Sequence, residues 1–210
     1  MNRNEKAGTF TEPDRWNHNA AYHPWILQRL RGRRAVLDVG CGDGLLLSRA
    51  ASVVGRDGIL AGIEPDGDCA AKAERRLRAI PGASVFRGTF EAFRASGGSF
   101  DAVVFLASLH HTDAGAALRK AKDLLAPGGI LLVVGLAKPE TAGDWCLEAL
   151  RVIPAKIGSL IRGEGKNRVP TAPPSMSYRM IRALCHSLLP GHRIRRGLYY
   201  RYLLEWHKPA

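Results

Sequence analysis

The fold of this chain is decided by one stretch near its start, Val36-Leu37-Asp38-Val39-Gly40-Cys41-Gly42-Asp43-Gly44. An apolar run ends in an aspartate, three glycines follow at alternate positions, and Leu45-Leu46-Leu47 begins a predicted helix. A turn with so few Cβ atoms between a strand and a helix lets a ligand lie against the backbone. The amides at the start of the helix face such a ligand, and Asp38 adds a carboxylate beside it.

This pattern resembles the first motif of the class I S-adenosylmethionine (SAM) dependent methyltransferases, D/E-x-G-x-G-x-G, which is matched at Asp38, Gly40, Gly42 and Gly44. A dinucleotide is the rival ligand, but its G-x-G-x-x-G fingerprint needs a glycine where this chain has Leu45. A pyrophosphate gains nothing from an anion before the first glycine, whereas the cationic amino group of SAM does. A glycine-rich turn without any ligand is the remaining alternative.

A second predicted strand supports the cofactor prediction, because residues 58–64 form an apolar run that ends in Glu64 and is followed by Pro65. Glu64 lies twenty residues past Gly44, close to the roughly 20-residue spacing that places a carboxylate on ribose hydroxyls in βαβ units. Its two oxygens can accept both ribose O–H groups. The alternative is a solvated acid at the end of a strand.

The resemblance implies further cofactor contacts along the chain. By position, Thr89 and Phe90 follow the third strand and would meet the adenine, although the family commonly has an aspartate where Thr89 stands. Pro65 and Leu106, at the ends of the second and fourth strands, complete the predicted SAM site. Cys41 is expected to be a small buried residue of the glycine turn, because a larger side chain would crowd the cofactor.

Alternating strands and helices predict an α/β, doubly wound, mostly parallel seven-stranded sheet with an antiparallel C-terminal hairpin. The 210 residues form a single predicted methyltransferase domain. Its parts are expected to be an N-terminal cap (1–34), a SAM-binding core (35–135), a helical and loop cap region (139–190) and the hairpin (191–210). A Leu-x-Pro-Gly-Gly turn at 125–129, before the predicted fifth strand at 130–134, is another motif common in the family that the chain resembles.

Composition and charge limit the location and the kinds of partner that we expect for this chain. No apolar stretch reaches the roughly 18 residues of a transmembrane segment, and no signal sequence begins the chain, so we expect a cytoplasmic protein. The net charge is +12, but the basic clusters are spread over several elements, which argues against nucleic acid and favours a solvated arginine-rich surface. The four cysteines lack paired spacing, and neither a disulfide framework nor a metal site is predicted.

Candidate catalytic residues follow the fourth predicted strand, where Leu109 precedes His110 and His111. In similar methyltransferases this segment lies beside the transferable methyl group, and one imidazole, His111 by preference, would act as a general base or orient the acceptor. The alternative is that both histidines are scaffold. Tyr22, His23 and Trp25 would contact the substrate from the N-terminal cap, although plain packing against the core explains them equally well.

The predicted function is SAM-dependent methyl transfer to an oxygen, nitrogen or carbon of a small-molecule acceptor. Phe105-Leu106-Ala107-Ser108 replaces the Asn/Asp-Pro-Pro-Tyr/Phe motif of enzymes that methylate base nitrogens, and no cysteine follows a proline, as cytosine C5 methylation requires. Two alternatives stay open. One is an RNA methyltransferase, and the other is a SAM-binding protein acting at a membrane surface through the apolar, arginine-bearing segment at 139–162. The oligomeric state is left open.

Overall fold

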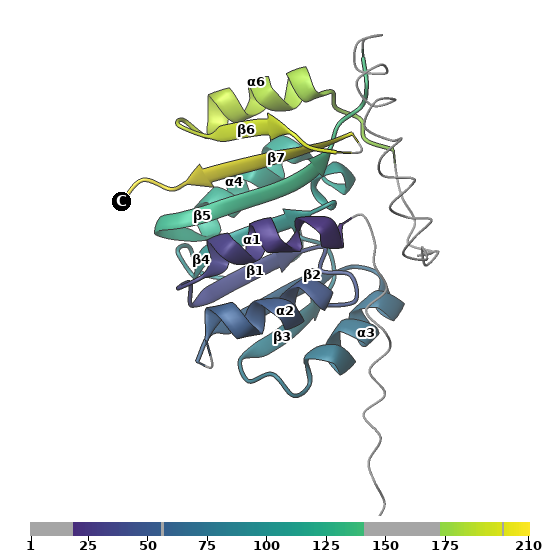
Figure 1. The fold of residues 1–210 in the computed structure, drawn as a ribbon, viewed down its shortest axis with the longest axis vertical. Helices are drawn as coiled ribbons and strands as arrows, with labels where there is room; N and C mark the ends of the chain where they lie inside the picture. The colour runs from purple at the N-terminus through teal and green to yellow at the C-terminus, as the bar shows by residue number, and fades with distance from the viewer. Residues whose placement is uncertain (1–18, 56, 141–172, 199) are drawn as a thin grey trace, which may run out of the picture.

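The computed structural model describes residues 19–55, 57–140, 173–198 and 200–210, whose strands form one sheet in the order β3-β2-β1-β4-β5-β7-β6 (Figure 1). The strands are β1 (Ala35–Val39), β2 (Ile59–Glu64), β3 (Ala83–Arg87), β4 (Phe100–Leu106), β5 (Leu125–Leu136), β6 (Arg193–Arg196) and β7 (Arg201–His207). The helices are η1 (Ala20–Tyr22), α1 (His23–Leu30), α2 (Leu45–Val54), α3 (Gly67–Leu77), η2 (Leu109–His111), α4 (Ala114–Leu124) and α6 (Tyr178–Leu188).

The sheet has the predicted mixed character. Strands β1 to β5 pair in parallel, whereas β7 pairs antiparallel with both β5 and β6. The doubly wound α/β fold with an antiparallel C-terminal hairpin is therefore confirmed. Strand β5 is longer than the predicted 130–134, because Leu125 already pairs with Phe100 before a register shift. Strand β7 begins at Arg201, because Tyr200 has a φ of 55° that a strand does not allow.

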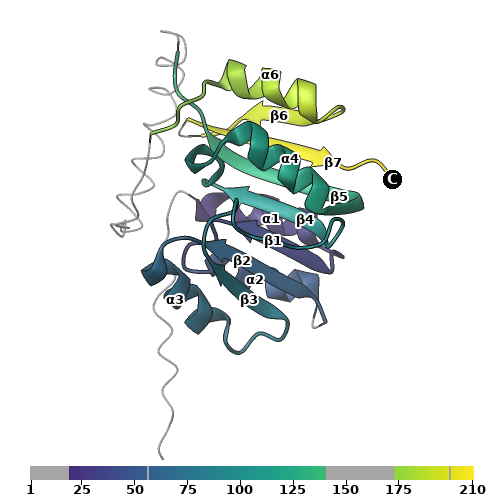
Figure 2. The ribbon, with the colours of Figure 1, turned by 180° about the vertical axis from the view of Figure 1, so that it is seen from behind.

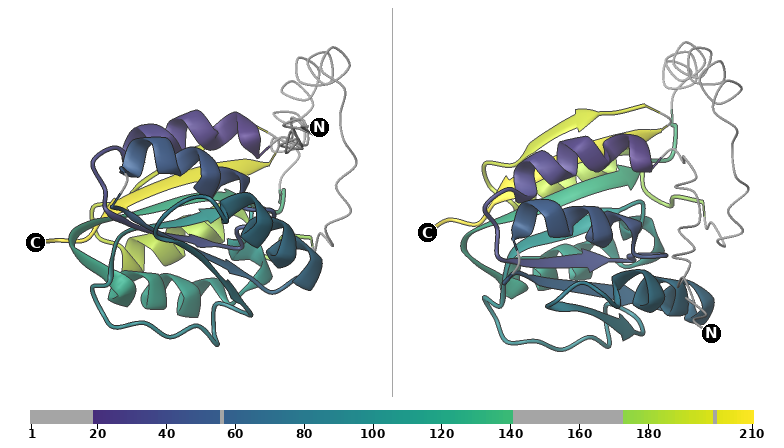
Figure 3. Two further views of the ribbon diagram at one scale, coloured as in Figure 1. Left: turned by 90° about the horizontal axis from the view of Figure 1, so that it is seen from below. Right: turned by 60° about the horizontal axis from the view of Figure 1, so that its bottom comes forward.

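Helices cover both faces of the sheet, as Figure 2 and the left view of Figure 3 show. Successive residues of a strand point to opposite faces, so Leu37 and Val39 pack with α4 and α6, whereas Val36 packs with α1 and α2. The central strands are apolar toward both faces, and Val103 and Val104 are each fully buried. This double burial explains why these segments are continuous apolar runs in the sequence.

All five parallel strands end at the same edge of the sheet, and the antiparallel pair extends that edge. Leu136, the last residue of β5, pairs with Arg201, the first residue of β7. The end of β6 and the start of β7 therefore lie beside the ends of β4 and β5. In open α/β sheets ligands bind outside the carboxyl ends of the strands, so the site is sought at this edge.

Two sequence expectations fall largely beyond the described residues. The predicted helical segment at 139–162 is described only to residue 140, and Cys146 lies in the part that is not described. The three cysteines that the structure describes, Cys41, Cys69 and Cys185, are free thiols. Within the described ranges, no helix has the length and apolar character needed to cross a membrane.

Candidate functional site

The glycine-rich turn between β1 and α2 has a backbone that ordinary residues avoid. Gly40, Gly42 and Gly44 have φ values of 75°, 56° and 77°, all in the left-handed region where a side chain is strained. The amides of Gly40 and Cys41 both donate to the carbonyl of Ile63 in β2, at 2.8 and 3.0 Å. The turn is thereby fixed to the neighbouring strand before the helix begins.

The three glycines differ in what surrounds them. A Cβ on Gly40 would lie 2.5 Å from the Cβ of Ser108, and a Cβ on Gly44 would lie 3.1 Å from the Cα of Ala73 in α3. Around Gly42, by contrast, no heavy atom lies within 4 Å of a Cβ. Gly40 and Gly44 thus permit close packing inside the protein, whereas Gly42 borders open space on the side where a cofactor would lie.

Two polar contacts hold the turn from outside. Glu64 at the end of β2 accepts a hydrogen bond from the Gly42 amide at 2.8 Å and another from the Asp66 amide at 2.9 Å. Arg76 of α3 forms an ion pair with Asp43 at 2.8 Å and also donates to the Asp43 carbonyl. Because each carboxylate oxygen has two lone pairs, Glu64 keeps acceptor capacity for ribose hydroxyls while it supports the turn.

Asp38 is a buried carboxylate whose Oδ1 atom has no hydrogen-bond donor among the described residues. Only 2% of the residue is exposed. Burial, together with the nearby charge of Glu64, raises the pKa of its carboxyl from 3.8 to about 7. A buried polar atom without a partner is unfavourable unless a ligand supplies the donor. Asp38 and the open side of Gly42 therefore fit the ammonium group and methionine backbone of SAM.

Other predicted cofactor residues lie around the turn with different exposures. Cys41 is buried, and its Sγ would lie 2.6 Å from a Cβ on Gly62, so its side chain packs onto β2. A small residue is needed at this position because its side chain contacts the sheet. This packing requirement adds to the one predicted from the sequence, that a larger side chain would crowd the cofactor. Pro65 is exposed and Leu106 is half-buried at the end of β4. Their cofactor contacts stay predictions.

Phe90 and Thr89, the two residues predicted to contact the adenine, differ in their burial. Phe90 is 3% exposed, packs edge-on against Phe105 with ring centroids 5.5 Å apart, and lies under the ammonium group of Lys120. Its side chain therefore belongs to the core, and an adenine contact would have to use its backbone. Thr89 is exposed, and its hydroxyl accepts from the Ala92 amide at 3.3 Å. Both adenine contacts stay predictions.

The histidine pair follows β4 in the short helix η2, with ring centroids 4.0 Å apart. His111 is exposed, whereas His110 is half-buried and its Nδ1 has no partner among the described residues. Burial, together with the positive charges of His111 and Arg201, lowers the pKa of His110 from 6.5 to about 4. His110 is therefore a neutral imidazole at pH 7. Ala107, just before this pair, has a strained φ of 57°.

The three residues predicted to contact substrate from the N-terminal cap all have protein partners. The Tyr22 hydroxyl accepts from the Leu198 amide at 2.8 Å and donates to its carbonyl at 3.1 Å. His23 is buried, with Nδ1 3.1 Å from the Arg49 guanidinium, and Trp25 stacks under Arg29 at 4.5 Å. These contacts fit the alternative of structural packing, and a substrate role for the three residues stays a prediction.

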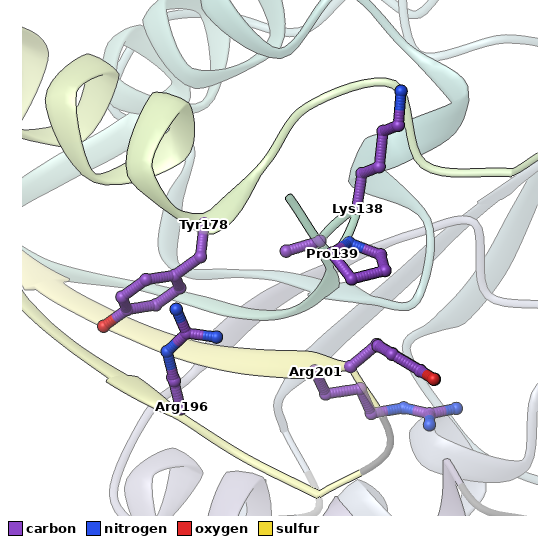
Figure 4. Close-up of a pocket in the computed structure, with 7 residues that line it drawn as sticks. Lys138, Pro139, Tyr178, Arg196 and Arg201 are labelled. Atoms are coloured by element: carbon purple, nitrogen blue, oxygen red, sulfur yellow. The ribbon is translucent and has the colours of Figure 1, made fainter. Parts of the chain in front are cut away.

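A pocket at the end of β5 and the start of β7 was missed by sequence reasoning (Figure 4). Its lining residues are Ala137, Lys138, Pro139, Tyr178, Arg196, Tyr200 and Arg201. They come from four separate segments, so no local motif marks them. A second depression, between α6 and β6, is rich in basic groups, and its lining includes Arg179, Arg182, Arg193, His186 and His192. In the described part of the chain, no three His, Cys, Asp or Glu side chains form a metal site.

Comparison with known proteins gives consistent results. Residues 36–129 match a family described as a methyltransferase domain. Over 199 residues the chain is 33% identical to an uncharacterized methyltransferase of Mycobacterium tuberculosis, a match that covers 93% of this chain and 98% of the relative. A match of 109 residues at 34% identity, to a ubiquinone biosynthesis O-methyltransferase of Azorhizobium caulinodans, covers 51% of this chain and 42% of that protein.

The fold also has relatives among solved structures. The crystal structure of a SAM dependent methyltransferase from Aquifex aeolicus aligns with a TM-score of 0.61 at 15% identity, covering 88% of each chain. At that identity the likeness concerns the fold alone.

Proposed function

Because the chain belongs to the class I SAM-dependent methyltransferase family, we propose that it transfers the methyl group of SAM to a small-molecule acceptor. The observation that carries this proposal is the buried Asp38 Oδ1, which lacks a donor among the described residues and lies on the strand that leads into the turn with Gly42. The site thus has a carboxyl group whose charged form a cationic ligand would stabilise, and open space where the backbone of that ligand would lie.

The chain's own residues hold the cofactor by complementary chemistry. Asp38 accepts from the ammonium group of the methionine part, and the second lone pairs of the Glu64 oxygens accept from ribose hydroxyls. Gly42 leaves room for the ligand. Pro65, Leu106, Thr89 and the backbone of Phe90 complete the proposed contacts. SAM supplies a methyl group bound to a sulfonium sulfur, which is already an activated leaving group.

The protein's contribution to the reaction is then mainly positioning. With SAM held at the glycine turn, the site would align a lone pair of the acceptor with the methyl carbon and with the sulfonium sulfur, which would leave with the electron pair of the carbon–sulfur bond. Holding the three atoms in line supplies much of the acceleration. An acceptor proton passes to His111 or to water. His110, with a pKa of about 4, is too weak a base for this task at pH 7 and is better suited to accept a hydrogen bond that orients the acceptor.

Calorimetry tests the cofactor half of the proposal. SAM and S-adenosylhomocysteine should each bind at one site per chain, and Gly42→Val should abolish binding, because a branched side chain would occupy the ligand's space. Gly128→Val is the matched control, since Gly128 also has a positive φ and open surroundings but lies in the first part of β5, at the opposite edge of the sheet. Micromolar binding of NAD without binding of SAM would contradict the proposal.

An RNA acceptor is the second candidate, and the basic depression between α6 and β6 is the observation that favours it. From residue 173 to the end, seven residues are arginine or lysine and Glu205 is the only acid. The lining of this depression includes one tyrosine, Tyr178, whose ring already stacks with Arg196, so we predict weak RNA association that fades steeply with salt. Tight binding of tRNA that persists at ~0.2 M salt would favour the RNA methyltransferase over the small-molecule enzyme.

A further inference from the structure

One lysine of helix α4 binds the loop that follows β3. The Lys120 ammonium group donates to the carbonyls of Phe90, Glu91 and Phe93, at 3.2 Å for Glu91 and 2.7 Å for Phe93. It also lies 4.9 Å from the centroid of the Phe90 ring. An ammonium group has three N–H donors and no acceptor, so one bond to each carbonyl uses all of them. A single side chain thereby fixes this piece of backbone to a helix that is distant in sequence.

The bound loop, residues 89–93, is a single helical turn. The Thr89 carbonyl accepts from the amides of Ala92 and Phe93, at 3.2 and 3.1 Å, and the Thr89 hydroxyl accepts from Ala92 at 3.3 Å. Carbonyls at the C-terminal end of a helical turn have no partner within it. Lys120 binds these carbonyls from another element, so its bonds fix the position of the turn as well as its shape.

The other polar contacts of the turn are local. Arg94 donates to the carbonyls of Glu91 and Phe93, at 3.0 Å for Phe93, but it belongs to the same loop. It therefore cannot set the place of the turn relative to the sheet. Among the residues that the structure describes, Lys120 supplies the hydrogen bonds that join residues 90–93 to another element.

The turn lies beside the proposed cofactor site. The amide of Gly88, directly before the turn, donates to the carbonyl of Glu64 at 3.1 Å, and the side chain of Glu64 accepts from the Gly42 amide. The Phe90 ring packs against Phe105, near the end of β4. The turn therefore contacts the ends of both β2 and β4, at the edge of the sheet where ligands bind.

Helix α4 also connects the turn with the histidine pair. The helix begins at Ala114, shortly after His110 and His111 in η2, and its N-cap residue Asp113 accepts from the backbone at 2.8 Å. Lys120 lies further along the same helix. Its bonds to the turn therefore hold the proposed cofactor site and the candidate catalytic segment in a fixed relative position.

We propose that Lys120 is a positioning residue of the cofactor site, which holds the turn so that its backbone recognises the adenine of SAM. The inference rests on the proposed function, in which Thr89 and the backbone of Phe90 contact the adenine. Hydrogen bonds to a base weaken steeply when a backbone group points in the wrong direction. Lys120 acts through the turn, so its removal leaves the contacts of Asp38 and Glu64 with the rest of the cofactor in place.

Two ligands that differ in the base test this positioning. S-adenosylhomocysteine and S-inosylhomocysteine share the amino acid and the ribose, but the second has an oxygen in place of the amino group of adenine and a proton on N1. In calorimetry the wild type should bind the adenosyl ligand about 10-fold or more tightly than the inosyl ligand. Lys120→Met removes the ammonium group and should weaken the adenosyl ligand by about 10-fold, with the inosyl ligand nearly unchanged. Lys120→Arg keeps a charged donor and should restore part of the preference.

Lys122→Met is the matched control. Lys122 lies on the same helix and is also half-buried, but its ammonium group meets the Leu188 carbonyl of α6 at 3.4 Å. This variant should keep the wild-type preference for adenine. Hydrogen exchange of the Ala92 and Phe93 amides reports on the turn itself and should be faster in Lys120→Met than in Lys122→Met. If Lys120→Met does not fold, Lys120→Gln, with a shorter neutral donor, takes its place and should show the same loss.

The outcomes separate the inference from the proposed function. A wild type that binds the two ligands equally overturns the inference, and so does a Lys120→Met variant that loses affinity for both equally. Equal losses in Lys120→Met and Lys122→Met also overturn it, because a general effect on α4 then explains both. In each of these cases SAM binding still stands. Absence of binding of both SAM and S-adenosylhomocysteine by the wild type defeats the proposed function instead.

Discussion

Replacing Asp38 by asparagine separates the effect of this carboxylate on folding from its effect on cofactor binding. Burial, with a smaller contribution from the charge of Glu64, raises the pKa of Asp38 from 3.8 to about 7. The folded protein therefore holds the Asp38 proton more tightly than the unfolded chain does. The charged form is the costly one, because no donor among the described residues meets its Oδ1 atom. Asp38→Asn keeps the size of the side chain and removes the charge.

The sign and size of the effect follow from proton linkage. Below about pH 4 both states bind the proton, so the stabilising effect of protonation in the folded state is fully present. Between about pH 4 and pH 7 only the folded state keeps it, and each pH unit removes about 1.4 kcal/mol from the free energy of unfolding. The complete loss above pH 7 is at most about 4 kcal/mol. Asparagine does not titrate, so the variant escapes this loss.

Urea unfolding of the SAM-free protein at pH 5.5 and pH 8 measures the difference. At pH 8, Asp38→Asn should be more stable than the wild type by about 1–3 kcal/mol, less than the maximum because its buried amide also lacks partners. At pH 5.5 the gain should shrink toward zero. The exposed Asp123 supplies the control variant, Asp123→Asn. SAM affinity of Asp38→Asn should fall by about 10-fold or more, because the ammonium group loses its charged acceptor.

Two results would refute this reasoning. If wild type and Asp38→Asn change stability in parallel between pH 5.5 and pH 8, the carboxyl does not titrate in that window. If the variant binds SAM as tightly as the wild type, Asp38 does not meet the ammonium group.

Three further predictions concern the rest of the site. Gly40→Ala should lower the free energy of unfolding by at least about 2 kcal/mol, because the new Cβ would lie 2.5 Å from that of Ser108, whereas Gly42→Ala should cost only about 1–2 kcal/mol of backbone strain; equal losses in urea unfolding would contradict this ordering. Glu64→Gln should weaken SAM binding in calorimetry by about 1.5–3 kcal/mol. Unchanged affinity would mean that Glu64 supports the turn but does not bind SAM. His111→Ala should reduce turnover by about 100-fold with nearly unchanged SAM affinity if His111 is the base, and full activity would leave catalysis by positioning alone.

The sheet and the cofactor turn were predictable because their signals are local. Each strand that is buried on both faces leaves a continuous apolar run, and the turn that follows β1 needs glycines at fixed offsets. The acid at the end of β2 has a defined spacing from that turn. These features depend on neighbours a few residues away, so one sequence contains them. The start of β5 was predicted less accurately, because it depends on the pairing of Leu125 with Phe100, a residue distant in sequence.

Side-chain direction was not predictable in the same way. Phe90 follows β3 where the family meets adenine, yet its ring packs against Phe105 and under Lys120, a contact that depends on how α4 crosses the sheet. Tyr22 binds the backbone of Leu198, a partner 176 residues away in sequence. The pocket of Figure 4 likewise combines the end of β5, the start of α6 and the hairpin of β6 and β7, so no local motif marks its lining residues.

The glycine motif shows that one sequence pattern can meet more than one structural requirement. Gly40 leaves room for Ser108, which follows β4, and Gly44 leaves room for Ala73 of α3. Gly42 faces open space. Only the last of these requirements concerns a ligand directly. The first two bring the carboxyl end of β4 and the helix that carries Arg76 against the turn, where Arg76 and Glu64 hold it in place. The motif therefore encodes a turn that is shaped before the cofactor arrives, and the binding energy of SAM need not be spent on ordering it.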